Sequence, residues 1–209
     1  TAHWAHVGGF VLGAVIGISL KFFGLEKKYI APMVEDSFEQ LKTSPRMREI
    51  NRKLNEGDTG AAVPLLLAVI NEEPENYDAP LMLARIYHEQ GDLDAAAVMY
   101  NRSLTALLRA ADHDLVRSTL EEVREKNLMH TVSEKNLYNL GLSLETGERF
   151  HEAAELFGIY VRQFPDGRVR AKALHKLYRL FKDKLDKPGM AQEALGFLKK
   201  EYPAFPVQE

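Results

Sequence analysis

The chain has 209 residues, with 27 lysine and arginine side chains against 30 aspartate and glutamate side chains, a formal net charge of −3, and no cysteine. This balance argues against a protein that coats nucleic acid, because phosphate contacts need a clustered basic surface. The absence of cysteine excludes a disulfide framework and any zinc site built from thiolates. The length allows one domain and an additional segment.

The first 23 residues form an apolar segment in which Lys21 is the only charged side chain. The stretch that begins at Trp4 would span about 30 Å as a helix, which matches the hydrocarbon core of a bilayer. Nothing basic precedes it, whereas Lys21, Lys27 and Lys28 follow, an order that disfavours a secretory signal peptide. We expect one transmembrane helix over residues 1–23, and the positive-inside rule places the rest of the chain in the cytoplasm.

Two histidines lie in this segment, together with a stripe of glycines at Gly9, Gly13 and Gly17. Glycines spaced by four residues let a second helix approach closely, and simple packing is the plainer interpretation of the stripe. We expect His3 to lie at the membrane interface. For His6, both a hydrogen bond to a neighbouring helix and a functional role are open. No carboxylate lies nearby, so we expect no metal site and no cofactor.

Residues 2–13, Ala-His-Trp-Ala-His-Val-Gly-Gly-Phe-x-x-Gly, resemble the last core transmembrane helix of the rhomboid intramembrane serine proteases. The resemblance implies that His6 is the catalytic general base. Gly9 and Gly13, at +3 and +7 from His6, would support close helix packing on the same face. That proximity would let the imidazole reach a serine hydroxyl on a partner helix.

The Gly-x-Ser-Gly motif that carries the nucleophile in that family does not occur in this sequence. The resemblance therefore predicts a C-terminal fragment of an intramembrane serine endopeptidase, with the serine upstream. It implies transmembrane protein substrates, contact with the lipid bilayer and localisation in a bacterial inner membrane. The alternative is a non-catalytic, membrane-anchored repeat scaffold or an inactive rhomboid relative.

Residues 24–45 are expected to form a juxtamembrane linker, and a repeating helical pattern follows over residues 46–206. The clearest unit reads Leu83-Ala84-x-x-Tyr87-x-x-x-Gly91-Asp92-Leu93-x-x-Ala96-x-x-x-Tyr100, which resembles the tetratricopeptide repeat (TPR). The fold class predicted for this part is therefore an all-α, TPR-like solenoid of helix pairs, in which small residues let helices nest and aromatic residues fill the gaps.

Three further units are expected around this one. The first keeps Gly57, Ala62, Leu66 and Pro74, and the third keeps Tyr138, Gly141, Ala153, Phe157, Tyr160 and Pro165, with its turn glycine, Gly147, shifted by one position. The fourth, at about 168–206, is degenerate. An additional helix is expected within residues 109–131, with Leu115, Leu120 and Val123 on one apolar stripe.

This repeat region contains no phosphate-binding loop, no metal motif and no nucleophile motif, so we expect protein interaction rather than chemistry from it. By analogy with the family, a groove would bind a cytoplasmic protein or peptide, and its lining would include Leu81, Arg85, His88, Tyr138, Leu142 and Glu145. No nucleic-acid partner is expected.

Overall fold

The computed structural model describes residues 44–207, and these residues form α-helices joined by short turns. The chain divides into two compact units, residues 1–58 and residues 59–209. Within the described part, the first unit contributes one helix, α3 (Pro45–Asn55), and the second contributes the remaining helices.

Helix α3 begins with two features typical of helix N-termini. Ser44 is the N-cap residue, whose hydroxyl accepts a hydrogen bond from the Met47 amide at 3.3 Å, and Pro45 occupies the first turn, where its missing amide proton is not needed. Ile50 is fully buried in this helix, while Arg52 pairs with Glu56 at 2.9 Å on its surface.

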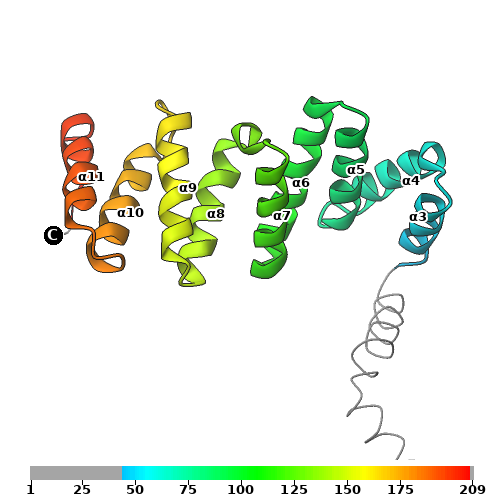
Figure 1. The fold of residues 1–209 in the computed structure, drawn as a ribbon, viewed down its shortest axis with the longest axis horizontal. Coiled ribbons are helices and arrows are strands. Elements are labelled where there is room, and N and C mark those ends of the chain that lie inside the picture. Colours follow the sequence, from blue (N-terminus) through cyan, green and yellow to red (C-terminus); the bar gives the residue numbers. More distant parts are fainter. Residues whose placement is uncertain (1–43, 208–209) are drawn as a thin grey trace, which may run out of the picture. The chain divides into compact units, whose positions relative to one another are not determined.

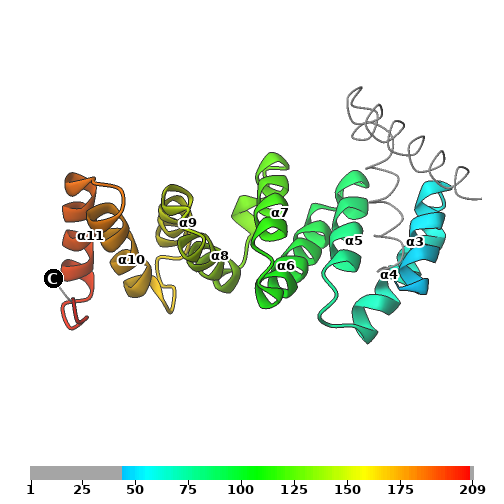
Figure 2. The same ribbon diagram turned by 90° about the horizontal axis from the view of Figure 1, so that it is seen from below.

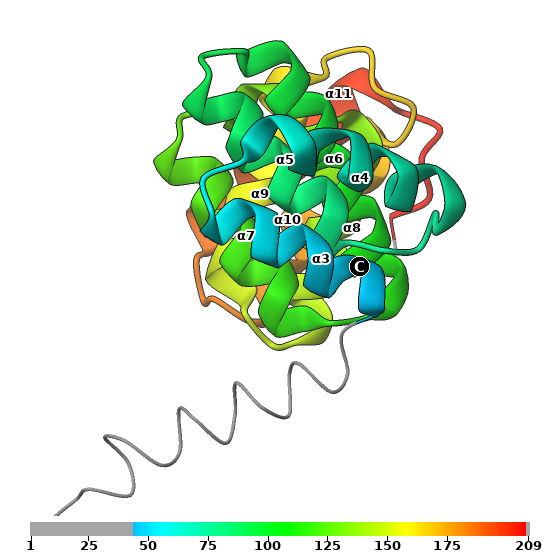
Figure 3. The same cartoon turned by 90° about the vertical axis from the view of Figure 1, so that its right-hand side faces the viewer.

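The second unit is a row of antiparallel helix pairs, shown in succession in Figures 1 and 2. Helices α5 and α6, α8 and α9, and α10 and α11 form three hairpins, and α4, α6 and α9 each pack against the first helix of the next hairpin. Seen from its end in Figure 3, the later helices of the row lie behind the earlier ones. The helices are α4 (Thr59–Glu72), α5 (Asp78–Glu89), α6 (Leu93–Ala110), α7 (His113–Glu125), α8 (Glu134–Thr146), α9 (Phe150–Gln163), α10 (Arg170–Asp183) and α11 (Pro188–Glu201).

The turns inside the hairpins need one residue with a positive φ. Gly91 supplies it between α5 and α6 at +80°, and Asp92 then caps α6 by accepting from the Ala95 amide at 3.0 Å. Because Gly147 is shifted by one position, a non-glycine residue, Glu148, takes this conformation between α8 and α9 at +59°. Asp186 does the same before α11, at +49°. The left-handed conformation strains a residue with a Cβ, so the two later turns are less favourable than the first.

The small and aromatic positions of the repeat pattern form the core, as predicted. Ala96 and Ala153 are fully buried, and Tyr100, Phe157 and Tyr160 are at most 1% exposed. The TPR-like, all-helical architecture expected from these positions is therefore confirmed for the described residues.

Gly141 on α8 shows why one of these positions excludes even a methyl group. A Cβ at this residue would lie 2.7 Å from Cε1 and 2.9 Å from Cζ of Phe157 on α9. These distances are shorter than a carbon–carbon contact allows, so the missing side chain sets how closely the two helices of this hairpin approach.

The additional helix predicted within residues 109–131 is α7, but its buried face differs from the expected stripe. Leu120 and Val123 are buried as predicted, whereas Leu115 is 36% exposed and Val116 is buried in its place. Positions 116, 120 and 123 follow the i, i+4, i+7 spacing of one helix face, and the sequence prediction placed the start of the stripe one residue too early.

A buried polar network anchors the chain after α7. The Asn101 side chain on α6 donates to the Thr131 carbonyl at 2.9 Å and accepts from the Ser133 amide at 2.8 Å. Asn136, 2% exposed on α8, donates to the Asn101 carbonyl at 2.8 Å and accepts from Thr105 at 2.9 Å. These bonds attach both the turn at Met129–Thr131 and helix α8 to α6, because buried polar groups left unpaired would destabilise the fold.

The transmembrane helix predicted over residues 1–23 lies outside the described residues, as does nearly all of the linker predicted at 24–45. Within residues 44–207, no helix combines the length and the apolar composition needed to cross a membrane. The longest of them, α6, has 18 residues and carries Asp94, Arg102 and Arg109. The described residues therefore give no support to the rhomboid-type transmembrane helix of the predicted fold.

Candidate binding groove

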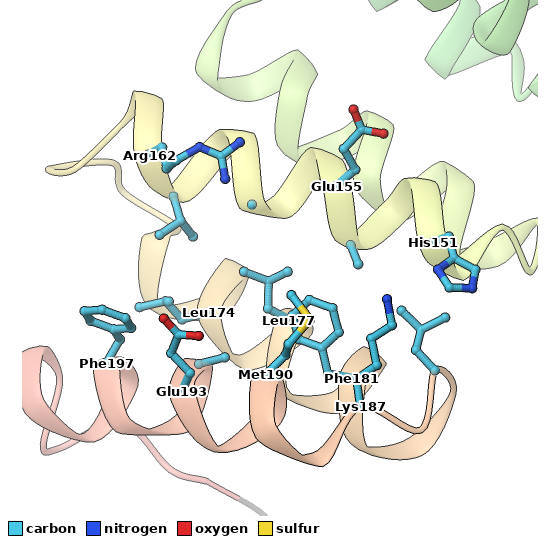
Figure 4. Close-up of a pocket in the computed structure, with 15 residues that line it drawn as sticks. His151, Glu155, Arg162, Leu174, Leu177, Phe181, Lys187, Met190, Glu193 and Phe197 are labelled. Carbon is cyan, nitrogen blue, oxygen red and sulfur yellow. The ribbon is translucent and has the colours of Figure 1, made fainter.

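An open groove of about 470 Å³ runs between α9 and α11, with α10 as its floor (Figure 4). Each helix contributes residues at the spacing of one helix face. The groove is lined by Ala154, Gly158 and Val161 from α9, by Leu174, Leu177 and Phe181 from α10, and by Met190, Ala194 and Phe197 from α11.

The two walls of the groove differ in the size of their side chains. On α9 the middle of the wall is formed by the small residues Ala154 and Gly158, one turn apart, so the helix surface is flat between His151 and Val161. On α11 the wall is formed by Met190 and Phe197, two large apolar side chains that are each 46% exposed. Apolar side chains of this size gain free energy when they are covered, and methionine adapts to partners of irregular shape.

Charged groups lie along both rims. Glu155 is paired with Arg124 of α7 at 3.0 Å, so its charge is compensated. The side chains of Arg162, Lys187 and Glu193 take part in no hydrogen bond or ion pair with any other residue of the 44–207 range. Figure 4 shows His151 and Lys187 at one end of the groove, and Arg162 and Phe197 at the other.

The groove predicted from the sequence is a different surface, and α7 covers part of it. Arg85 on α5 donates to both carboxylate oxygens of Glu122 on α7, with the shortest contact at 2.7 Å, and the Tyr100 hydroxyl donates to the same carboxylate at 2.6 Å. His88 lies 3.5 Å from the Lys126 ammonium group. Two of the predicted groove residues therefore contact α7 of the same chain.

Two pKa shifts follow from this contact. Burial of Glu122 acts to raise its pKa, but hydrogen bonds from Arg85 and Tyr100 outweigh burial and hold the pKa below its ordinary value. Burial and the bond to Glu122 raise the pKa of Tyr100 above its usual range. Glu122 is thus ionised at neutral pH and holds α7 against α5 and α6.

The other predicted groove residues make packing or ion-pair contacts within the row of helices. Leu81, Tyr138 and Leu142 pack against the buried core. The Tyr138 ring lies 5.6 Å from that of Phe157, and Glu145 pairs with Lys176 of α10 at 2.7 Å. Leu142 and Glu145 line two different hollows.

One hydrogen bond joins a histidine and a serine on different helices. Nδ1 of His113 on α7 lies 2.7 Å from Oγ of Ser143 on α8, in a second hollow of about 330 Å³. The two residues lie 30 positions apart in the sequence, so no local motif joins them. His113 is exposed and Ser143 is half-buried, and the bond joins α7 to α8. In the part of the chain that the structure describes, no cluster of histidine, aspartate or glutamate could hold a metal ion.

Comparison with known proteins places two segments of the chain in one family. Residues 53–118 and residues 135–167 each match a family model described as "Tetratricopeptide repeat". The matched segments are tetratricopeptide repeats. Among curated proteins, none matches the chain.

Solved structures of "MamA AMB-1" in two crystal forms are similar to this chain. One is 20% identical, with 78% of this chain and 92% of that chain covered and a TM-score of 0.39. The other is 21% identical, with 74% and 95% covered and a TM-score of 0.37. Scores this low carry no argument about function, so the repeat assignment depends on the family models and on the helix packing above.

These findings correct the rhomboid interpretation. The chain matches tetratricopeptide repeats, which suggest protein interaction, so the identification as part of a rhomboid-type serine endopeptidase is wrong. The transmembrane substrates, the bilayer contact and the inner-membrane localisation that followed from it have no support either. His6, Gly9 and Gly13 lie outside the described residues, and their assigned roles stay a prediction that no structural observation tests.

The signal that could have located the α9–α11 groove is present in the sequence of the fourth unit. Met190 and Phe197 are large apolar residues at i and i+7 on a helix whose buried face already uses Ala191, Ala194 and Leu198. A second apolar stripe beside the buried one indicates a surface that another molecule can cover.

Proposed function

We propose that the chain is a non-catalytic scaffold that binds a partner protein through the groove between α9 and α11. Tetratricopeptide repeats in both halves of the described region support a role in protein interaction. Large apolar side chains that are half exposed line this groove, whereas the hollow beside His113 and Ser143 is lined mainly by polar and charged side chains.

The observation that carries the proposal is the exposure of Met190 and Phe197 beside Phe181. Covering the exposed halves of Met190 and Phe197 contributes about 1–3 kcal/mol together, by the usual free energy of burying apolar side chains. Such side chains, when they line a concave surface, act as anchors for a partner.

Site-specific crosslinking tests this function. A photoreactive amino acid at position 190 should crosslink the partner in cells, whereas the same amino acid in place of Val98 on α6 should not. Val98 is a matched control because it is apolar and 61% exposed but lies outside the groove. The crosslinked protein is then identified, purified and titrated against the wild-type chain and two leucine variants.

Gly158→Leu should weaken this binding at least about tenfold, because the new side chain projects into the groove. Gly196→Leu adds the same side chain on α11 at a glycine with open space around it and should bind like wild type. Equal crosslinking from positions 190 and 98, or equal affinity of the two leucine variants, would show that the groove is not the binding surface.

A further inference from the structure

The shape and the charge of the groove, together with its apolar lining, indicate which kind of partner segment it binds. Building on the proposed function, we propose that the groove binds an amphipathic α-helix of a partner protein. This helix runs antiparallel to α9 and α11 and carries acidic residues in its last turn.

The shape of the groove favours a helix. Its two walls and its floor present apolar residues at the i, i+3 or i+4, and i+7 positions of three helices, the arrangement into which the ridges of a further helix pack. From Met190 to Phe197 the wall on α11 rises about 10 Å, or two helical turns. The flat wall at Ala154 and Gly158 leaves room for a backbone to approach α9 closely.

The direction of the bound helix follows from the direction of its neighbours. Helices α9 and α11 each pair antiparallel with α10, so they are parallel to each other and both begin at the same end of the groove. That end holds His151, in the first turn of α9, and Lys187, the N-cap residue of α11 (Figure 4). Two helix N-termini carry partial positive charge there.

The charge along the groove is therefore uneven. At the end where α9 and α11 begin, Lys187 and the two helix N-termini are positive, and no carboxylate lining the groove lies beside them (Figure 4). At the other end Arg162 and Glu193 balance one another in net charge, and in the middle Glu155 is neutralised by Arg124. A helix that places its negative C-terminal end and acidic side chains beside Lys187 complements this field.

In this orientation the bound helix would pack against α9 and α11 in the same direction as α10 does. A bound helix that runs antiparallel to α9 and α11 lies in the same direction as the floor helix, and its dipole opposes those of the two wall helices. The apolar face of the helix would cover Phe181, Met190 and Phe197, and its acidic last turn would reach Lys187.

Two synthetic peptides test this proposal on the full 209-residue chain. Both carry leucines at i, i+4 and i+7 and a fluorescent label. The first has two glutamates in its last turn, and the second has the same two glutamates in its first turn, so composition and apolar face are identical. We expect the first peptide to bind about five- to tenfold more tightly by fluorescence anisotropy, because the attraction of its two carboxylates to Lys187 and to the N-termini of α9 and α11 should exceed their unfavourable interaction with the dipole of the peptide's own helix.

Three variants of the chain test whether Lys187 and the groove cause the preference between the two peptides. Lys187→Glu should abolish or reverse the preference between the peptides, whereas Lys200→Glu, a charge change on an exposed residue of α11 outside the groove, should preserve it. Gly158→Leu should remove binding of both peptides. Equal affinity of the two peptides for the wild-type chain, or an unchanged preference in Lys187→Glu, would overturn the proposed charge recognition.

Other occupants give different results. Self-association of the chain, detected by light scattering and lost in Gly158→Leu, would make the occupant a second copy and refute the partner helix. If neither peptide binds while a purified partner crosslinks from position 190, the helix proposal fails and the scaffold function stands.

Discussion

Replacing Gly141 by alanine adds one methyl group at the closest approach of α8 and α9. The new Cβ would lie 2.7 Å, 2.9 Å and 3.0 Å from three carbon atoms of the Phe157 ring. That ring is fully buried and packs in a tilted arrangement against the Tyr138 ring, with the ring centroids 5.6 Å apart, so it cannot rotate away without displacing a second aromatic residue.

Two effects of opposite sign decide the stability of this variant. Alanine in place of glycine inside a helix stabilises by about 0.5–1 kcal/mol, whereas overpacking a filled core costs about 1–3 kcal/mol. The contact distances are short on three atoms, so overpacking should dominate and leave a net loss of about 1 kcal/mol. For a chain of this size that corresponds to a decrease in Tm of about 2–4 °C.

Gly158→Ala on α9 provides the matched control. Its Cβ would meet only the tip of the Arg162 side chain, at 3.5 Å, so the helix gain of about 0.5–1 kcal/mol should appear undiminished and raise Tm. Thermal unfolding of both variants followed by circular dichroism measures the difference. If Gly141→Ala is as stable as wild type, or if Gly158→Ala is destabilised as well, the contact between Gly141 and Phe157 does not limit the packing of this hairpin.

Two further predictions concern a strained turn and an internal ion pair. Glu148→Gly should raise the free energy of unfolding by about 1 kcal/mol, because glycine adopts the left-handed conformation at +59° without strain. Glu148→Ala keeps the strain and should not be stabilised. Urea unfolding of the two variants checks this, and equal midpoints would show that residue 148 is not strained. Glu122→Gln should reduce stability at neutral pH, and its difference from wild type should shrink as the pH falls below about 4. The pKa of Glu122 is lowered in the folded state, so its contribution is present above the unfolded pKa and is lost as the pH falls through the folded pKa. Urea midpoints measured from neutral to acidic pH test this, and a difference that stays constant would show that the charge of Glu122 does not hold α7 in place.

The repeat region was predictable from the sequence because its signal is local. Ala96 and Tyr100 lie one turn apart on one helix, and their small and large side chains reveal the helix face without knowledge of any other segment. The shift of Gly147 likewise predicts an altered turn, and the structure shows its consequence in the positive φ of Glu148. The apolar segment at residues 1–23 showed the limit of such signals, since its resemblance to one family led to a function that the repeats do not support.

Which surface remains open was decided only by the tertiary structure. Arg85 and His88 occupy positions expected to face a groove, but α7, some 37 residues further along the chain, folds over them through Glu122 and Lys126. Conversely, Met190 and Phe197 stay half exposed beside an open groove because α9 and α11 stand apart on the two sides of α10. Helix periodicity determines which residues share a face, but whether that face is covered depends on contacts between segments distant in sequence, and those contacts form only when the whole row of helices packs.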